Sequence, residues 1–200
     1  MNENLYVDRR IRKTRKLLRE SLLKLMSKKK LHDITVKELC EEADVNRGTF
    51  YAHYRDVYDL FAIMEDEIFD ELSLVLSNYY LTADMLTQKK QLPCFLEAFE
   101  YLVENYALCE VLLGINRDQI FIDKISDVGR SRCVMAWVQL YNTISRRDAE
   151  YFYSFTVSGC IGILQYWLSN GRKESAKELA QLAERFILQG IPILKPSPKR

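Results

Sequence analysis

A short segment near the first quarter of the chain concentrates side chains that can donate hydrogen bonds to phosphates and to the edges of bases. The segment reads NRGTFYAHY, and its donors are Arg47, Thr49, Tyr51 and His53. Gly48 lies among them and has no Cβ, so the backbone there can approach a partner closely. Side chains of these types bind the DNA backbone and read base edges. The segment therefore has the chemistry of a DNA-contacting helix.

The flanking residues predict two short helices joined by a tight turn. Thr35, followed three residues later by Glu38, has the pattern of a capping box and starts a helix at about Thr35. Asp44 tolerates the left-handed backbone that such a turn requires, and Asn46 is a good N-cap for the second helix, over about 47–54. A helix-turn-helix places its second helix in the DNA major groove. A further helix is expected from Asp56, its N-cap, which would hold the reading helix between two packed ones.

The charge of the chain is unevenly distributed. Residues 1–55 contain 14 Lys and Arg against 8 Asp and Glu, a net charge of +6, whereas the remainder has a net charge of −5. Between Arg9 and Lys30 there are 11 basic residues and one acidic residue, Glu20. Such a cluster attracts backbone phosphates. The alternatives are an ordinary solvated helix face and a basic amphipathic helix on anionic lipid, but the leucines of this helix are better used in a small core.

The segment ITVKELCEEADVNRGTFYAHYRDVYDLF resembles the DNA-binding segment of TetR-type transcriptional regulators, and the likeness covers about Asp8 to Phe69. It implies a three-helix DNA-binding domain, a helical regulatory domain and a homodimer. In that family, DNA is contacted by the residues that match Arg47, Thr49, Tyr51 and His53. From the pattern and the resemblance together, we expect a DNA-binding surface made of seven residues: Lys37, Asn46, Arg47, Gly48, Thr49, Tyr51 and His53.

Three positions depart from the usual pattern of the family. Lys30 stands where a glycine commonly ends the first helix, and Asp44 stands where a glycine commonly opens the turn. Val57 replaces a lysine that commonly approaches a phosphate, which removes one expected contact. The residue matching Tyr54 is usually Phe and packs inward.

The remainder of the chain predicts an all-α fold of about nine helices. We expect a DNA-binding domain over 8–69, a helical ligand-binding and dimerisation domain over 70–190, and a loose tail over 191–200. After a loop over 81–93, helices are expected at about 94–113, 118–126, 129–145, 148–170 and 175–189. No apolar run is long enough for a membrane span and no signal peptide is evident, so the sequence predicts a cytoplasmic protein without a membrane partner.

The five cysteines are odd in number and widely spaced, and only two histidines accompany them. They favour buried reduced thiols over a disulfide frame or a metal site, with a redox sensor as the alternative. The chain has no glycine-rich phosphate loop and no Ser–His–Asp set, so we expect neither an enzyme nor a cofactor.

The segment SFTVSGCIGILQYWLSNG is apolar on more than one face and carries small residues that allow another helix to approach. We expect the last two helices to pair with their copies in a second chain, unless they form an ordinary core. The predicted interface consists of Ser158, Gly159, Gly162, Trp167, Leu179, Leu182 and Phe186. The same segment resembles the C-terminal region of TetR regulators related to those of dihydroxyacetone-kinase operons.

Together these features predict a dimeric, sequence-specific DNA-binding repressor that binds double-stranded DNA at a palindromic operator. An unidentified small-molecule effector would bind between the C-terminal helices and switch DNA binding. The candidate ligand-binding residues are Phe99, Tyr106, Trp137 and Tyr141. The alternative is a regulator whose C-terminal domain binds a protein partner instead of a metabolite.

Overall fold

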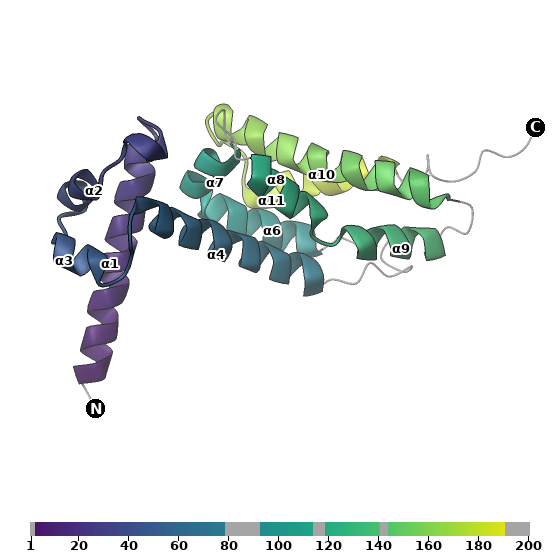
Figure 1. Cartoon of the computed structure of the whole chain (residues 1–200). Coiled ribbons are helices and arrows are strands. Elements are labelled where there is room, and N and C mark those ends of the chain that lie inside the picture. The colour runs from purple at the N-terminus through teal and green to yellow at the C-terminus, as the bar shows by residue number, and fades with distance from the viewer. Residues whose placement is uncertain (1–2, 79–92, 114–118, 141–143, 191–200) are drawn as a thin grey trace, which may run out of the picture. The chain divides into compact units, whose positions relative to one another are not determined.

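The computed structural model describes residues 3–78, 93–113, 119–140 and 144–190, which contain helices and no β-strand (Figure 1). The predicted all-α class is therefore confirmed. In the first part of the chain the elements are α1 (Glu3–Met26), the 3-10 turn η1 (Leu31–Asp33), α2 (Val36–Ala43), α3 (Arg47–Tyr51) and α4 (Val57–Asn78). In the second part they are α6 (Pro93–Glu104), α7 (Tyr106–Leu113), α8 (Gln119–Asp127), α9 (Arg130–Leu140), α10 (Arg146–Ser169) and α11 (Ala176–Gly190).

The chain divides into two compact units, Met1–Ile68 and Phe69–Arg200, and the division falls within α4. The predicted tail over 191–200 and the predicted loop over 81–93 lie outside the described residues, except that Pro93 begins α6. Within the described residues, none of the helices combines the length and the apolar character that crossing a membrane requires.

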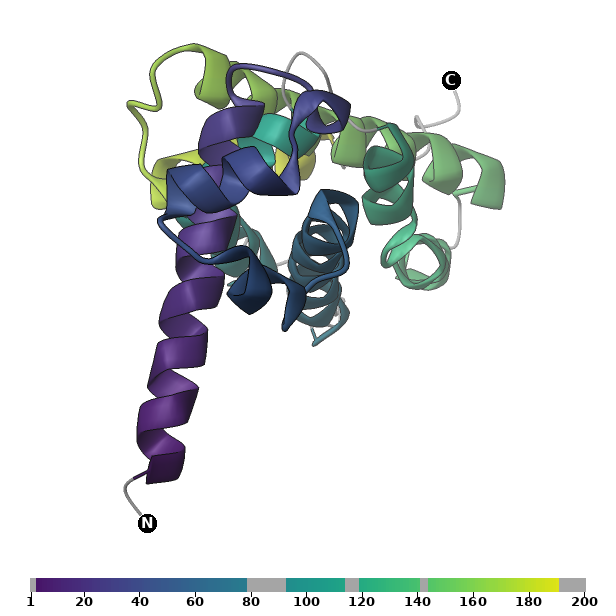
Figure 2. The same ribbon diagram turned by 60° about the vertical axis from the view of Figure 1, so that its left-hand side comes forward.

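The first unit is built around the C-terminal half of α1. Leu18, Leu22 and Leu25 of α1 are buried, so the apolar stripe of this helix is used inside the unit. α2 packs on α1, and α3 packs on α2. Figure 2 shows the N-terminal half of α1 projecting beyond α2 and α3. The first turns of α4 complete this core through buried Val57 and Leu60.

The second unit is a helical bundle in which α6 packs on α11, and α10 packs on α9, α11 and α7. The single helix predicted over 94–113 is wrong, because two helices meet at Asn105. The Asn105 side chain donates to the carbonyl of Tyr101 (2.9 Å), and its own carbonyl accepts from Leu108 (3.0 Å) and Cys109 (3.1 Å). The side-chain bond helps to end α6, and the backbone carbonyl of Asn105 accepts the first hydrogen bonds of α7.

Ser175 and Glu178, at the start of the helix predicted over 175–189, form a capping box in both directions. The Ser175 amide donates to the Glu178 carboxylate (2.8 Å), and the Glu178 amide donates to the Ser175 hydroxyl (3.3 Å). The Ser175 hydroxyl also donates to this carboxylate (2.8 Å). The bonds from the Ser175 amide and hydroxyl lower the pKa of Glu178, because they favour its charged form. The start of α11 is thus fixed by its own first turn.

Candidate nucleic-acid interface and effector cavity

Local hydrogen bonds position α2 in part as the sequence predicts. The Thr35 hydroxyl accepts from the amide of Glu38 (3.2 Å), so Thr35 is the N-cap. The reciprocal half of the predicted capping box is wrong, because the Glu38 carboxylate accepts from Lys29 instead of turning back to Thr35. Glu38 therefore connects α2 to the end of α1 and does not close the first turn of α2.

The turn between α2 and α3 has the predicted geometry. Asp44 is left-handed (φ 50°, ψ 46°), and the Val45 amide closes the turn onto the carbonyl of Cys40 (3.0 Å). Asn46 caps α3 by accepting from the amide of Gly48 (2.7 Å). A Cβ added to Gly48 would lie 3.2 Å from the Asn46 side-chain oxygen, so the cap itself favours glycine at this position.

α3 has one buried and one exposed side. Phe50 has no exposed surface and Tyr54, beyond the end of the helix, is also buried, so both anchor the segment. Arg47, Thr49 and Tyr51 are exposed, whereas the imidazole of His53 is half-buried. The helix is shorter than predicted: it ends at Tyr51, and a turn leads to Tyr54. All three donors on α3 are thus accessible, while Phe50 holds the helix against the core.

Position 57 belongs to the core of the first unit. Val57 is buried, and Asp56 caps α4 through its side chain, which accepts from the amide of Asp59 (2.8 Å). The apolar side chain of Val57 stabilises this packing instead of reaching a phosphate.

Several of the basic residues expected to attract DNA hold the first unit together. Arg19 donates to both carboxylate oxygens of Glu67 (2.6 Å each), and this hydrogen bonding, together with the nearby Tyr54 hydroxyl, raises the pKa of Arg19. Lys24 forms an ion pair with Glu42, and Lys29 forms one with Glu38. Since these cations are neutralised within the unit, the positive surface is smaller than the sequence count suggests.

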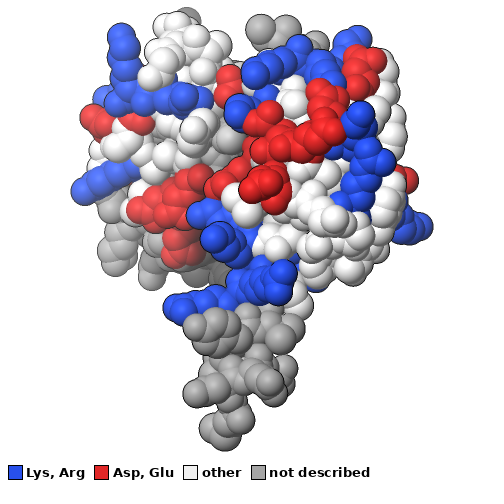
Figure 3. Space-filling model, turned by 90° about the vertical axis from the view of Figure 1, so that its left-hand side faces the viewer, with Lys and Arg blue, Asp and Glu red and all other residues white. Residues whose placement is uncertain are grey.

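A basic arm remains at the N-terminal half of α1. We define it as Arg9, Arg10, Lys13 and Arg15, all of which are exposed. Among the described residues none of the four forms an ion pair. Figure 3 shows Lys and Arg gathered on this part of the surface, next to the residues drawn in grey. Predicted Lys37, on α2, is exposed as well and lies 3.9 Å from Glu41.

The second unit encloses a cavity of about 190 Å³, lined by residues of α4, α6, α7, α8, α9, α10 and α11. Of the four predicted ligand-binding residues, Phe99 and Trp137 line it. Tyr106 does not: it lies on the surface beneath the Arg172 guanidinium, 4.1 Å from the centre of its ring. Tyr141 lies outside the described residues.

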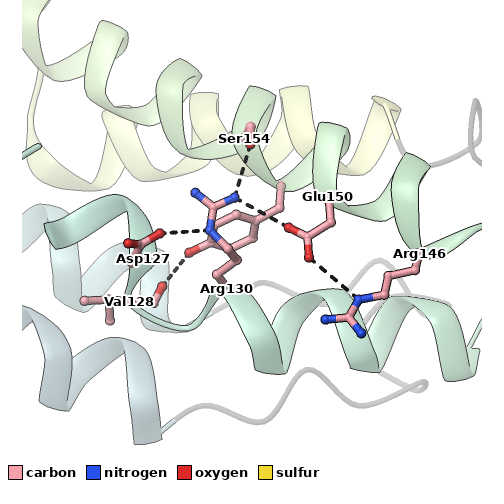
Figure 4. Close-up of polar contacts among 7 residues, drawn as sticks. Asp127, Val128, Arg130, Arg146, Glu150 and Ser154 are labelled. Atoms are coloured by element: carbon pink, nitrogen blue, oxygen red, sulfur yellow. Dashed lines mark hydrogen bonds and ion pairs between the residues drawn. The ribbon is translucent and has the colours of Figure 1, made fainter. Parts of the chain in front are cut away.

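Tyr153 also lines the cavity, and sequence reasoning did not select it. Its hydroxyl donates to the carbonyl of Val128, in the turn between α8 and α9, and burial raises its pKa, so it remains a donor. Figure 4 shows Arg130 beside this turn, between Asp127 (3.0 Å) and Glu150 (3.5 Å). The Arg130 guanidinium lies 5.1 Å from the centre of the Tyr153 ring. An exposed polar network therefore fixes one wall of the cavity.

The exposed side of α10 carries an apolar stripe, which we define as Tyr151, Phe155, Gly159, Gly162 and Tyr166. The three aromatic side chains are 65–70% exposed, and a Cβ added to either glycine would meet no atom within 4 Å. Residues three and four apart share one face of a helix, so these five form a continuous surface. Predicted Ser158 lies next to it and is exposed.

Two residues predicted for the dimer interface belong to the interior of the chain. Trp167 is 4% exposed and its indole N–H donates to the carbonyl of Glu174 (2.9 Å), while Leu179 is 3% exposed. Their side chains have little surface left for a partner, because α10 packs against α11. Leu182 is half-buried and Phe186 is exposed.

Among the described residues, Cys40, Cys109, Cys133 and Cys160 are not joined in disulfides. Burial raises the pKa of Cys109 to about 12 and that of Cys133 to about 11. In the part of the chain that the structure describes, no three metal-binding side chains cluster.

Two family models match this chain. Residues 18–63, which include the helix-turn-helix, match bacterial regulatory proteins of the tetR family. Residues 89–189, just over half of the chain, match the C-terminal region of transcriptional regulators in a TetR group. The chain belongs to the TetR family of transcriptional regulators. TetR-family regulators bind DNA, so the DNA-binding role predicted from the sequence is confirmed at that level.

A curated relative of this TetR-family chain shares its sequence at low identity. The uncharacterized HTH-type transcriptional regulator YxbF of Bacillus subtilis strain 168 is 22% identical over 172 residues, which are 86% of this chain and 44% of that protein. The chain thus spans under half the length of this curated relative.

Solved structures share the TetR fold over most of their length. The fatty acid degradation regulator FadR from Bacillus halodurans has a TM-score of 0.61 at 13% identity, over 89% of this chain and 96% of that chain. The dihydroxyacetone kinase operon activator DhaS has a TM-score of 0.59 at 17% identity, over 92% and 98%. A TetR regulator from Streptococcus agalactiae 2603V has a TM-score of 0.56 at 20% identity, over 92% and 99%.

Proposed function

We propose that this TetR-family regulator is a homodimeric repressor that binds a palindromic operator and that a small molecule in the second unit switches its DNA binding. The observation that carries the proposal is the two-sided α3. Phe50 and Tyr54 anchor the segment, while Arg47, Thr49 and Tyr51 are each exposed. This arrangement supports insertion of α3 into the major groove, where arginine reads guanine and hydroxyls position the backbone.

Each predicted DNA contact has a distinct role in this proposal. Arg47, at the start of α3, contacts a base or a phosphate. Thr49, Tyr51 and His53 position phosphates, with Lys37 in support. The basic arm of α1 adds sequence-independent attraction to the backbone, since every phosphate neutralised releases counterions. Asn46 and Gly48 allow the backbone of the turn to approach the DNA.

The apolar stripe of α10 supports a homodimer. Exposed apolar residues that lie next to one another mark an interaction site more often than single scattered ones do. Small residues at Ser158, Gly159 and Gly162 let the copies of α10 approach closely, and exposed Phe186 with half-buried Leu182 extend the surface onto α11. A two-fold dimer presents two reading helices to successive major grooves about 34–36 Å apart.

α4 supports a route from the cavity to the DNA-binding unit. Leu72 and Leu76, in its second half, line the cavity, whereas Val57 and Leu60, at its start, are buried in the first unit. A ligand shifts DNA affinity only through its different affinity for two states of the protein. We propose that the position of α4 differs between those states.

The test is selection of bound duplexes from a random DNA pool at two salt concentrations. Recovery of a palindrome, with affinity falling steeply as salt rises, is the expected result. Salt-sensitive binding without a recovered sequence would overturn the proposal. It would favour the alternative of a protein partner for the second unit, which a thermal-shift screen would support by finding no stabilising metabolite.

A further inference from the structure

The cavity of the second unit has a chemical character that restricts its ligand. Its volume is about 190 Å³. Cavities for drug-sized ligands run from about 300 to 1,000 Å³, whereas an apolar cavity of about 150 Å³ holds a benzene molecule. The available space therefore matches a molecule with roughly one aromatic ring.

The lining is uncharged. No Asp, Glu, Lys, Arg or His contributes to it among the described residues, and most of its members are aliphatic or aromatic. Moving an isolated charge from water into such surroundings is strongly unfavourable. A carboxylate or an ammonium ligand is therefore excluded, unless it becomes neutral by gaining or losing a proton.

Two buried polar atoms of the lining lack hydrogen-bond partners among the described residues. They are the indole Nε1 of Trp137, on α9, and the hydroxyl of Thr156, on α10. By contrast, Tyr153 in the same wall has its hydroxyl bonded to Val128. Because buried donors are nearly always satisfied, these two indicate a partner that the protein itself does not supply. The indole N–H only donates, so that partner must carry an acceptor.

Two thiols, those of Cys133 and Cys160, lie in the wall of the cavity. Burial raises the pKa of Cys133 to about 11, so its thiol is protonated at neutral pH and is a poor nucleophile. We therefore assign no covalent role to Cys133 and attribute ligand binding to apolar contact and hydrogen bonds.

We infer that the cavity binds a small uncharged molecule of about one ring, with a carbonyl or hydroxyl oxygen that accepts from Trp137 and Thr156. The inference rests on the proposed function in that this ligand would be the effector. The site itself is defined by its volume, its uncharged wall and its two unpaired donors.

The probes are acetophenone, ethylbenzene and benzoate, which share a ring and differ in the acceptor and the charge. Binding to the full-length protein without DNA is measured by calorimetry and by the shift in melting temperature. Acetophenone should bind more tightly than ethylbenzene, and benzoate should not bind. Trp137→Phe and Thr156→Val should each weaken acetophenone binding about 3- to 10-fold, the worth of one neutral hydrogen bond. Thr156→Val should leave the affinity for ethylbenzene unchanged, and Trp137→Phe, which also removes apolar surface from the wall, should weaken ethylbenzene less than acetophenone.

Trp167→Phe is the matched control, because the N–H of Trp167 is already bonded to Glu174. It should lower the melting temperature without changing the preference for acetophenone, whereas Thr156→Val, which keeps the shape of the side chain, should not lower the melting temperature of the free protein.

Three results would overturn the assignment: tighter binding of benzoate than of acetophenone, an equal loss of affinity for acetophenone and ethylbenzene in each variant, or no binding of either neutral probe together with destabilisation by Thr156→Val. The last result would mean that water satisfies the two donors. None of these readouts uses DNA. Binding of acetophenone without any effect on operator affinity would refute the proposed switch and leave the ligand site intact.

Discussion

Replacement of Gly159 tests the proposed dimer interface, because one substitution should stabilise the isolated subunit and weaken the dimer. A glycine inside a helix costs about 0.5–1 kcal/mol relative to alanine, and leucine is nearly as good a helix former as alanine. A Cβ at this position would meet no atom of its own chain within 4 Å. Gly159→Leu should therefore raise the free energy of unfolding of the isolated subunit by up to about 1 kcal/mol.

The same side chain should weaken the proposed dimer. Helices in contact lie about 8–10 Å apart, and a leucine forced into a tightly packed contact costs about 1–3 kcal/mol. Two-fold symmetry introduces the leucine twice, so the dissociation constant should rise at least about tenfold, since each 1.4 kcal/mol is a factor of about ten.

Sedimentation velocity over a dilution series measures the dissociation constant of the dimer. Urea unfolding at protein concentrations below that constant measures the stability of the subunit alone, because association contributes to apparent stability. Gln139→Leu places the same side chain on an exposed position of α9, outside the stripe, and should leave association unchanged. If Gly159→Leu gained subunit stability while dimerising as wild type does, the stripe of α10 would not be the interface.

Three further predictions concern the rest of the chain. Asp44→Gly should raise the free energy of unfolding by about 0.5–1 kcal/mol in chemical denaturation, because Asp44 is held at φ 50° where glycine has no steric penalty; a loss would show that the Asp44 side chain stabilises the turn. Arg9→Gln with Arg10→Gln should reduce the slope of log affinity against log salt by about 2 if both contact phosphates, and an unchanged slope would remove the basic arm from the interface. Cys109 and Cys133 should resist alkylation at pH 8 in the folded protein and react in urea, because burial holds their pKa values near 12 and 11; rapid labelling in the native state would favour a thiol sensor.

Local features of the fold could be read from the sequence because their interactions span only a few residues. The N-caps at Thr35 and Asn46 and the left-handed turn at Asp44 depend on side chains next to the backbone they satisfy. The same holds for the capping box at Ser175, in which both partners lie in one helical turn.

Features that depend on distant residues could not be read in this way. Glu38 has the spacing of a capping box, but Lys29 competes for its carboxylate from the end of α1. On α10, apolar residues occur all round the helix, so periodicity could not separate buried Trp167 from Tyr166, which is 70% exposed. The unpaired indole N–H of Trp137 is visible only once the neighbouring helices are in place.

The central claim is that α3 reads base sequence, and its most direct test is the affinity of Arg47→Ala for the selected operator and for a scrambled duplex at one salt concentration. If Arg47 reads a guanine, the variant should lose about 1–3 kcal/mol on the operator, lose far less on the scrambled duplex, and tolerate any base at one operator position. An equal loss of affinity for both duplexes would contradict base reading and show that Arg47 contacts only phosphate.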